Sequence, residues 1–574
     1  MGLPERQTVG VATSDDAHRA AHRRAYDIFE GLQSDQREAA LADLPAAALE
    51  AQSQGWSDVA LVLDAAAVVD VVTHPGAGHA AAGPISGTIG EAADELVARA
   101  QELGSSALQG LAFGLRAVVS VNADDKAGAV LDAARATALL DVEDESPLDR
   151  CVGYVVAAAA FNTLRLWELV DDLYGRALRF GPAARETRQT AAIVVNRVLT
   201  RLEWALAAVE YGDVESGDVQ LAQSRPHGRE SMPPQRGGAA LADRLLDSML
   251  EAVPAALAEE LPTLWRLNVL ACADVASLLR GLDVDQTLGR VDEHRRLLAD
   301  AGDLEVLPML EAATAVALWR CGRRDAAVEA ASRLGPAASA TSGAETFPLW
   351  ARAHVLAAAE PSAATQAQLD HARAVVRLVW ESRRTVLAAA RAQILSEARK
   401  HEHEALTHAV NTDALTGLFN RRRFELWLQQ SVGKPRVSTA LLLIDVDDFK
   451  EVNDRFGHDC GDEVLRTLAS LMASSVRADD VAIRHGGDEF ALILEGDDLL
   501  PAAVRERAEK LSAAVSGASW ADIAPGLKVS VTIGAALSVG RDSDDVRPVT
   551  LYKRADAALY QAKRSGSRIA LSEL

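Results

Sequence analysis

Apolar residues recur three and four positions apart through most of residues 15–400, a pattern that predicts one helix after another. The segment is rich in Ala, Leu and Arg and shows little of the strict alternation that is typical of strands. In LPMLEAATAVALWRCGRRDAAVEAASRLGP, two helical patterns flank the short turn RCGRRD, and Pro336 stops the second one. We therefore predict an all-α region over residues 1–361.

Pairs of helices separated by short Gly or Asp turns, with Ala at close-contact positions, resemble tetratricopeptide-type repeats. A strict period of about 34 residues, the value typical of that family, is not found. Two interpretations stay open: a helical repeat array or irregular bundle, and one large α-helical domain without repeats. Between the helical blocks, SRPHGRESMPPQRGG (224–238) combines Pro, Gly and charged residues and predicts a disordered loop.

Residues 362–410 predict one long linker helix that leads into the C-terminal part of the chain. Trp380, Leu387 and Ile394 recur every seven residues and form a partial coiled-coil seam, which the charged Arg383 and Glu397 interrupt. A plain amphipathic helix that packs on its own chain explains the pattern equally well.

Residues 411–574 change to alternating strands and helices. Four stretches predict strands, namely STALLLIDVDDF, VAIRH, EFALILE and LKVSVTIGAALS, and two predict amphipathic helices, GDEVLRTLASLMASSV and LYKRADAALYQAKRSG. This order predicts an α/β domain with a central sheet and flanking helices. The chain as a whole is therefore expected to be multidomain, with a helical N-terminal region followed by an α/β domain.

The charge and hydropathy of the chain argue against two kinds of partner, nucleic acids and membranes. Residues 1–410 hold 38 Lys and Arg against 57 Asp and Glu, and residues 411–574 hold 21 against 25, within a formal net charge of −23. Such an acidic chain repels nucleic acids, so we expect no nucleic-acid partner. No apolar run has the length of a membrane helix, and the N-terminus lacks a secretory pattern. The four cysteines show no CxxC spacing, and we expect a cytoplasmic protein without a membrane partner.

The stretch RHGGDEF (484–490) is either an ordinary hairpin turn with solvated acids or a site of chemistry. Gly486 and Gly487 accept positive φ and can turn the chain sharply between two strands. Such a hairpin would bring Asp488 and its neighbouring glutamate to the edge where the strand ending at Asp445 also ends. Carboxylates that converge repel one another unless cations lie among them, and their hard oxygen atoms suit Mg²⁺ or Mn²⁺.

Four motifs carry a family resemblance: DALTGLFNRRRFE (413–425), DVDDFKEVNDRFGHDCGDEVL (445–465), RHGGDEF and ADAALYQAKRSG (555–566). They occur in the order and spacing of the GGDEF family of diguanylate cyclases, and the resemblance covers residues 411–574. It implies a fold similar to nucleotidyl cyclase catalytic domains and a reaction that joins two GTP into cyclic di-GMP with release of two pyrophosphates. It also implies two Mg²⁺ (or Mn²⁺) ions per active site and a homodimer that brings two GTP-loaded domains face to face.

The resemblance assigns roles to the acidic residues and one lysine. It implies metal ligands at Asp445, the main-chain carbonyl of Val446, Asp488 and Glu489. It also implies catalytic roles at Asp488, Lys450 and Glu489, with Lys450 beside the triphosphate. Asp488 matches the family's proton acceptor, although a metal-bound carboxylate is a weak base and a water molecule can serve instead.

The resemblance also implies a substrate-binding set, made of Asn453, His458, Asp462, Lys563 and Arg568. Asn453 and Asp462 match the guanine-contacting positions, where a carboxylate accepts from the N1–H and amino edge that adenine lacks. Lys563 matches a phosphate-binding lysine. The sequence departs from the family just after it, because Ser567 stands where an arginine is usual. Either Arg568 reaches the phosphate instead, or one phosphate contact is missing.

The segment RADD places Arg477 and Asp480 at the offset of the family's RxxD inhibitory site. There the arginine can fork onto a phosphate or guanine edge of bound product while the aspartate accepts from a guanine. The plain structural interpretation is an arginine at a helix end near backbone carbonyls.

Two functional hypotheses follow. The first is an active diguanylate cyclase regulated by its helical N-terminal region and by product at the RxxD site. The alternative is a catalytically inactive protein that senses GTP or cyclic di-GMP while its helical repeats bind a protein partner. In either case the helical region is expected to recognise a protein or a small molecule.

Overall fold

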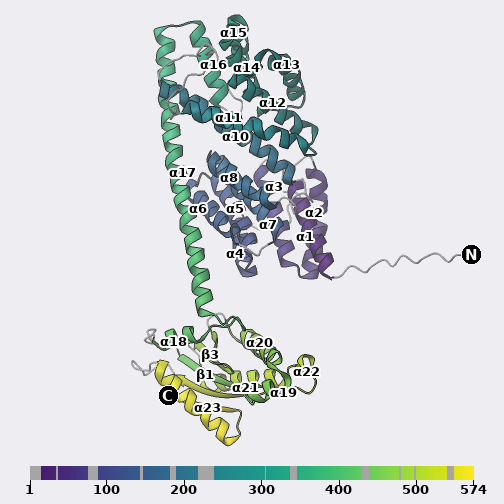
Figure 1. Cartoon of the computed structure of the whole chain (residues 1–574), viewed down its shortest axis with the longest axis vertical. Helices are drawn as coiled ribbons and strands as arrows, with labels where there is room; N and C mark the ends of the chain where they lie inside the picture. The colour runs from purple at the N-terminus through teal and green to yellow at the C-terminus, as the bar shows by residue number, and fades with distance from the viewer. Residues whose placement is uncertain are drawn as a thin grey trace, which may run out of the picture. The chain divides into compact units, whose positions relative to one another are not determined.

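The computed structural model of the chain divides into two compact units, Met1–His401 and Glu402–Leu574 (Figure 1). The structure describes residues 14–33, 36–74, 88–142, 146–180, 189–216, 238–303, 305–335, 346–429, 438–477, 480–496, 499–538 and 548–573. The loop predicted at 224–238 lies outside these residues, apart from its last glycine.

The first unit is helical throughout its described residues, which confirms the predicted all-α class. Its helices are α1 (Ser14–Gly31), α2 (Arg37–Gln54), α3 (Ser57–Thr73), α4 (Ile89–Leu103), α5 (Ser106–Asn122), α6 (Lys126–Leu140), α7 (Pro147–Thr163), α8 (Trp167–Ala177), the 3-10 turn η1 (Leu178–Phe180), α10 (Gln189–Ser216), α11 (Gly238–Ala258), α12 (Thr263–Arg280), α13 (Val284–Asp300), α14 (Val306–Arg320), α15 (Arg324–Arg333), α16 (Thr346–Ala359) and α17 (Ala363–Asn411).

Capping residues fix where several of these helices begin and end. Helix α4 begins with a capping box, in which the Thr88 hydroxyl accepts from the backbone N–H of Glu91 and the Glu91 carboxylate accepts from the Thr88 N–H. It ends at Gly104, whose φ of 74° lies in the left-handed region that glycine adopts without strain. Short polar turns of this kind return each helix alongside the previous one.

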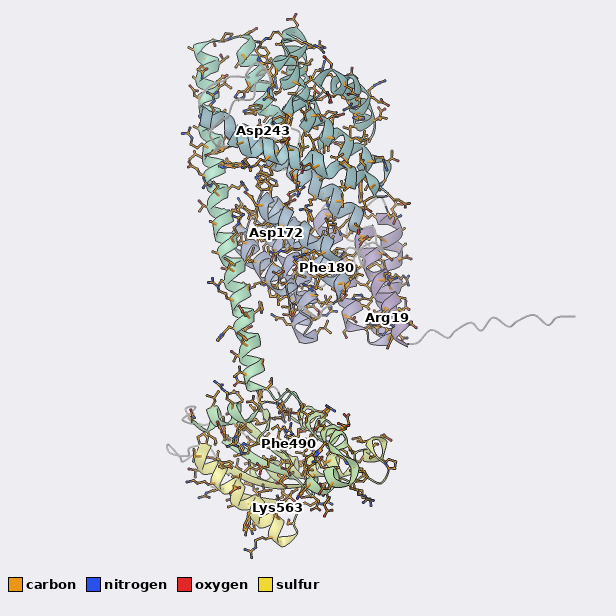
Figure 2. All side chains as sticks on the ribbon, viewed as in Figure 1. Arg19, Asp172, Phe180, Asp243, Phe490 and Lys563 are labelled. Carbon is orange, nitrogen blue, oxygen red and sulfur yellow. The ribbon has the colours of Figure 1, made fainter. Side chains whose placement is uncertain are left out.

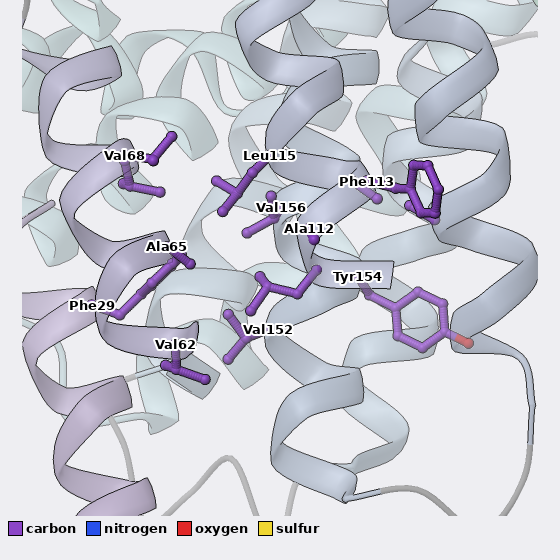
Figure 3. Close-up of a cluster of buried hydrophobic side chains, with 14 of the residues drawn as sticks. Phe29, Val62, Ala65, Val68, Ala112, Phe113, Leu115, Val152, Tyr154 and Val156 are labelled. Carbon is purple, nitrogen blue, oxygen red and sulfur yellow. The ribbon is translucent and has the colours of Figure 1, made fainter. Parts of the chain in front are cut away.

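Two main hydrophobic cores hold the helical unit together. The first gathers side chains from α1 to α8, and Figure 3 shows part of it, with Phe29, Val62 and Ala65 facing Val152. The second gathers side chains from α10 to α16. Apolar faces three and four residues apart thus pack against each other as the sequence pattern predicted.

Helix α17 contributes side chains to both cores. Leu387 and Ala390 are buried in the first core, and Trp380 is buried in the second, where its ring stacks on Tyr211 at a centroid distance of 4.8 Å. The two charged residues that interrupt the seam, Arg383 and Glu397, are also buried, at 7% and 8% exposure. The heptad positions therefore pack on helices of the same chain, as a plain amphipathic helix does.

The second unit is built on a five-stranded sheet with strand order β2-β3-β1-β4-β5. Its elements are α18 (Arg421–Gln429), β1 (Ser438–Val446), α19 (Phe449–Phe456), α20 (His458–Ser475), β2 (Val481–Arg484), β3 (Glu489–Gly496), α21 (Pro501–Gly517), α22 (Trp520–Ile523), β4 (Val531–Ser538), α23 (Pro548–Ser565) and β5 (Ile569–Glu573). All neighbouring strands are antiparallel except β4 and β5, which are parallel. The predicted α/β class is confirmed.

Helices cover both faces of this sheet. Leu442 and Ile444 of β1 point to the core shared with α20 and α21, whereas Leu441 and Leu443 point to the core shared with α18 and α23. The strand is buried on both sides because it is central, which explains its nearly unbroken apolar sequence. Asp445, near the end of β1, and Asp447, just after the strand, are thereby held where the central strand of the sheet ends.

No helix among the described residues combines the length and the apolar character that crossing a bilayer requires.

Candidate active site

The Gly-Gly turn joins β2 to β3 and leans against the end of β1. The backbone N–H groups of His485 and Gly486 both donate to the carbonyl of Glu489, at 2.8 and 3.0 Å, and close the turn. The N–H of Val446 donates to the carbonyl of Asp488 at 3.1 Å, and Asp445 lies opposite Glu489 in the β1–β3 register. The predicted approach of the turn to the end of β1 is confirmed.

The carboxylate of Asp445 faces a lysine across this edge. The Nζ atom of Lys563, which α23 carries (Figure 2), lies 2.6 Å from Asp445 Oδ1. Burial is the main cause that raises the pKa of Asp445 above its usual value, and the charges of Asp488 and Asp447 raise it further, while Lys563 opposes them. The site thus concentrates negative charge in a half-buried place where a cation is favoured.

The reason for the two glycines differs from the one that the sequence suggested. The glycines with φ in the left-handed region do not include Gly486 or Gly487, so positive φ is not what the turn requires. A Cβ atom at Gly486 would lie 2.8 Å from Glu489 Oε2, because the glutamate side chain folds back over the turn. A Cβ atom at Gly487 would meet nothing within 4 Å.

Arg484 holds the turn in place, a role that the residues beside it in the sequence do not indicate. Its guanidinium donates to Asp413 Oδ1 at 3.0 Å and to the carbonyl of Gly487 at 2.8 Å. Asp413 also accepts from the backbone N–H and the hydroxyl of Thr416. The DALTG and RHGG motifs are therefore two halves of one hydrogen-bonded clamp.

The pKa of the Asp413 carboxyl is lowered by this clamp. Burial by itself raises that pKa, but the hydrogen bonds from Thr416 and Arg484 outweigh the burial. Asp413 therefore stays ionised and holds Arg484 over the turn.

His485 has an aromatic environment. Its ring contacts Phe424 edge-on at 4.8 Å and Tyr552 at 6.0 Å. Burial lowers its pKa, so the ring packs as a neutral aromatic group.

Asp447 anchors the loop after β1. Its two carboxylate oxygens accept hydrogen bonds of 2.6 Å each, from the hydroxyls of Ser530 and Thr532. The next residue, Asp448, has φ 53°, a left-handed conformation that costs free energy for a residue with a side chain. This strained turn starts α19 directly after the acids of β1.

The predicted guanine-contacting residues lie where α19 meets α20. Asn453 lies against Gly461, because a Cβ atom at position 461 would overlap the Asn453 side-chain oxygen. Asp462 is half-buried on α20, while His458 at the start of α20 and Lys450 on α19 are exposed. The close packing at Gly461 therefore brings Asn453 next to the turn of α20 that carries Asp462.

Arg568 is directed elsewhere. Its guanidinium donates to Ser516 Oγ of α21 at 3.0 Å, on the face of the sheet opposite α23 and Lys563. The structure therefore does not bring it together with Lys563 in this state.

Asp480 of the RADD segment has a structural role. Its carboxylate accepts from the backbone N–H of Arg477 at 3.0 Å and from Arg507 at 3.1 Å, and its side chain is only 4% exposed. The Arg477 side chain is exposed.

The donor atoms at the end of β1 fit a hard divalent cation, although a three-carboxylate cluster is not formed. Among the described residues, no group of three His, Cys, Asp or Glu side chains is arranged to hold a metal. What the site offers is the half-buried Asp445, the carbonyl of Val446 and the nearby Asp488, all oxygen donors of the kind that Mg²⁺ prefers. Lys563 supplies the positive charge that these oxygens attract.

Comparison with known proteins places the second unit in a class. Residues 410–568 match the family model described as "Diguanylate cyclase, GGDEF domain". This part of the chain is a GGDEF domain, with a five-stranded sheet, helices on both faces and acidic residues at the end of β1.

Several known proteins are similar to this part of the chain. The chain is 44% identical over 161 residues to the response regulator PleD of Caulobacter vibrioides, covering 27% of this chain and 34% of that protein. It is 36% identical over 168 residues to the diguanylate cyclase DgcS of Shewanella oneidensis, covering 29% of this chain and 53% of that protein. The GGDEF domain of DgcB from Caulobacter crescentus, solved with c-di-GMP, is 29% identical, with a TM-score of 0.26, covering 28% of this chain and 95% of that one. The chain thus spans between a third and about half of the length of these two curated relatives.

Proposed function

We propose that the chain is a diguanylate cyclase, which condenses two GTP into cyclic di-GMP and releases two pyrophosphates. The observation that carries the proposal is the meeting of Asp445, Asp488 and Lys563 at one sheet edge within a GGDEF domain. The relatives named diguanylate cyclases share this part of the chain.

Asp445, the Val446 carbonyl and Asp488 would hold Mg²⁺ or Mn²⁺, with Glu489 as a further ligand once its side chain turns away from Gly486. When bound, a divalent ion there would lower the pKa of a bound hydroxyl and neutralise phosphate charge. We propose two such ions per site, as the family resemblance implies.

The remaining residues act on the substrate by binding and orientation. In the proposal Lys563 leaves Asp445 for a phosphate when GTP arrives, and Lys450 adds positive charge beside the triphosphate. Asn453 and Asp462 select guanine, with His458 at the rim of the same α19–α20 junction. Asp488, or a water next to it, accepts the proton of the attacking 3′-hydroxyl.

Catalysis of this kind needs two GTP-loaded domains face to face, so we propose a homodimer. Leu406 and Val410, near the C-terminal end of α17, are 59% and 45% exposed. Leu406 and Val410 are four residues apart and so lie on the same face of the helix. Exposed apolar side chains in this arrangement favour packing against a partner helix.

Product inhibition is a further part of the proposal. Arg477 would bind cyclic di-GMP through its exposed guanidinium. Asp480 would join only by releasing Arg507, so binding exchanges an internal contact for one to the product.

The decisive experiment measures cyclic di-GMP formed from GTP and Mg²⁺ by the full chain, with Asp488→Asn as the test variant. We expect the variant to lose nearly all turnover, because a ligand and proton-accepting group is removed. Asp522→Asn, an exposed aspartate on α22, is the matched control and should keep full activity. Equal rates in Asp488→Asn and wild type would refute the catalytic assignment. Binding of GTP or cyclic di-GMP by wild-type protein without any turnover would instead support the alternative of an inactive sensing protein.

A further inference from the structure

The helical unit contains a hollow of about 510 Å³ between α8, η1, α10 and α17. A volume of this size is typical of sites that bind small molecules. Its lining is dominated by charged residues, namely Glu168, Asp171, Asp172, Arg176, Arg179, Arg197 and Arg391, together with Trp204 and Gly175. We refer to it as the arginine pocket, and Figure 2 labels Asp172 at its wall.

Every carboxylate that lines the arginine pocket is already paired. Glu168 accepts from Arg383 through both of its oxygens, at 2.6 and 2.7 Å. Asp171 accepts from Arg197 at 2.8 Å and from the neighbouring Arg201 at 2.7 Å. Asp172 pairs with Arg176, whose second partner is an aspartate outside the pocket. The acids therefore act as internal counter-charges, and little of their accepting capacity is left for a ligand.

The polar groups of the pocket that have no partner among the described residues are hydrogen-bond donors. Arg179 on η1 and Arg391 on α17 are exposed, and neither has a hydrogen bond or ion pair to any described residue. The Nε1–H of Trp204 is buried and also lacks a partner within the described part of the chain. A buried N–H without an acceptor costs free energy that a ligand oxygen would recover.

The pocket lining therefore holds four guanidiniums against three carboxylates, and two of these guanidiniums have no partner among the described residues. Arginine forks match the two oxygens of a carboxylate or a phosphate, and the indole adds an apolar wall with one donor. We propose that the arginine pocket binds a small organic or inorganic anion with at least two negative charges, held between Arg179 and Arg391 and accepting from Trp204. This site is separate from the proposed catalytic one, and its ligand belongs to the class of dicarboxylates and phosphates.

The test is isothermal titration of the full chain with succinate, citrate and inorganic phosphate, each at constant ionic strength. We expect at least one of them to bind with one site per chain. The double variant Arg179→Ala/Arg391→Ala should weaken binding at least about tenfold, since each lost charge-assisted bond accounts for roughly that factor. Binding of succinate or citrate alone would identify a carboxylate site, and binding of phosphate alone a phosphate site.

The matched control is Arg377→Ala. Arg377 is exposed on the same helix but lies 14 residues from Arg391, roughly 21 Å along the axis, and does not line the pocket. The Arg377→Ala variant should bind the anion with the same affinity as the wild-type protein. Trp204→Phe gives a second readout: the anion should change indole fluorescence in wild type, and this change should be reduced in the variant. Absence of binding by all three anions, or equal affinity in wild type and the double variant, would overturn the proposal. Equal affinity would also show that any phosphate bound lies elsewhere, for example in the GGDEF domain.

Discussion

The clamp formed by Arg484 gives the sharpest prediction about the GGDEF domain. Replacing Arg484 by methionine keeps most of the side-chain volume but removes the hydrogen bonds to Asp413 Oδ1 and to the Gly487 carbonyl. The side chain of Arg484 is 14% exposed and that of Asp413 25%, so water restores only part of what is lost. The bond to Asp413 is partly buried and joins two charged groups, a kind that contributes about 1.5–3 kcal/mol, whereas the bond to the Gly487 carbonyl is exposed and contributes less.

We expect Arg484→Met to lower the free energy of unfolding of the GGDEF domain by roughly 1–3 kcal/mol. We also expect kcat for cyclic di-GMP formation to fall about 10–100-fold, because the turn that carries Asp488 is no longer held in place and small misplacements are costly. The loss in stability depends on the structure alone, whereas the loss in kcat also depends on the proposed function.

A double-mutant cycle with Asp413→Asn isolates the pair. If the two side chains stabilise the domain through their contact, the double variant should be destabilised by about 1 kcal/mol less than the sum of the two single variants. Arg505→Met, an exposed arginine on α21, serves as the control and should leave stability and rate unchanged. Fully additive effects, or a variant as stable as wild type, would refute the clamp.

The pKa shift of Asp413 adds a dependence on pH. Its pKa is lowered in the folded domain, so the stability from this pair is present above the usual aspartate pKa and is lost as pH falls through the folded value. In Arg484→Met this acid-induced loss should become smaller, as measured by urea unfolding between neutral and acidic pH.

Two further predictions concern other parts of the chain. Glu210 is buried on α10 and accepts from Thr346, and burial raises its pKa from 4.5 to about 7. The folded helical unit therefore holds this proton more tightly than the unfolded chain, and its stability should fall by roughly 3 kcal/mol as pH rises from 4.5 to 7. Glu210→Gln should remove that slope in urea unfolding followed by circular dichroism, and an unchanged slope would contradict the assignment. Arg477→Ala should weaken inhibition by added cyclic di-GMP about tenfold or more while the initial rate stays near that of wild type. If inhibition is the same in both proteins, the RADD segment is only the turn that Asp480 holds.

Much of the fold was predictable because its signals are local. The unbroken apolar run before Asp445 predicts a strand buried on both faces, and adjacent glycines between two short strands predict a hairpin. The three- and four-residue spacing of the N-terminal region predicts helices in the same way. The acids of the site were found because the turn and the strand end are both visible in the sequence, and their meeting needs only the antiparallel pairing of β1 with β3.

The remainder depends on contacts between residues far apart in the chain. Arg484 and Asp413 are 71 positions apart, and nothing in the residues beside either one indicates the other. The direction of Arg568 toward Ser516 is decided by where α21 packs, which periodicity does not fix. The reason for Gly486 could not be predicted from the sequence either. It depends on the side chain of Glu489, which folds back over the turn and leaves no room for a Cβ atom at Gly486.

The same reasoning explains why Arg383 interrupts a heptad pattern without disturbing the helix that contains it. Its guanidinium is buried, donates to both carboxylate oxygens of Glu168, and lies over the rings of Trp167 and Trp380, at 5.0 and 4.6 Å. Glu168 also lines the arginine pocket, so one carboxylate connects the buried anchor of α17 with the pocket wall. An anion held between Arg391 and Arg179 would add another attachment of α17 to the helices around it, beside its buried side chains and the Arg383–Glu168 pair. A ligand that binds only the attached state stabilises that state by mass action. The chain of α17 continues into the residues that precede the GGDEF domain, and the arginine pocket is thereby a place where a small anion can influence how firmly this helix is held.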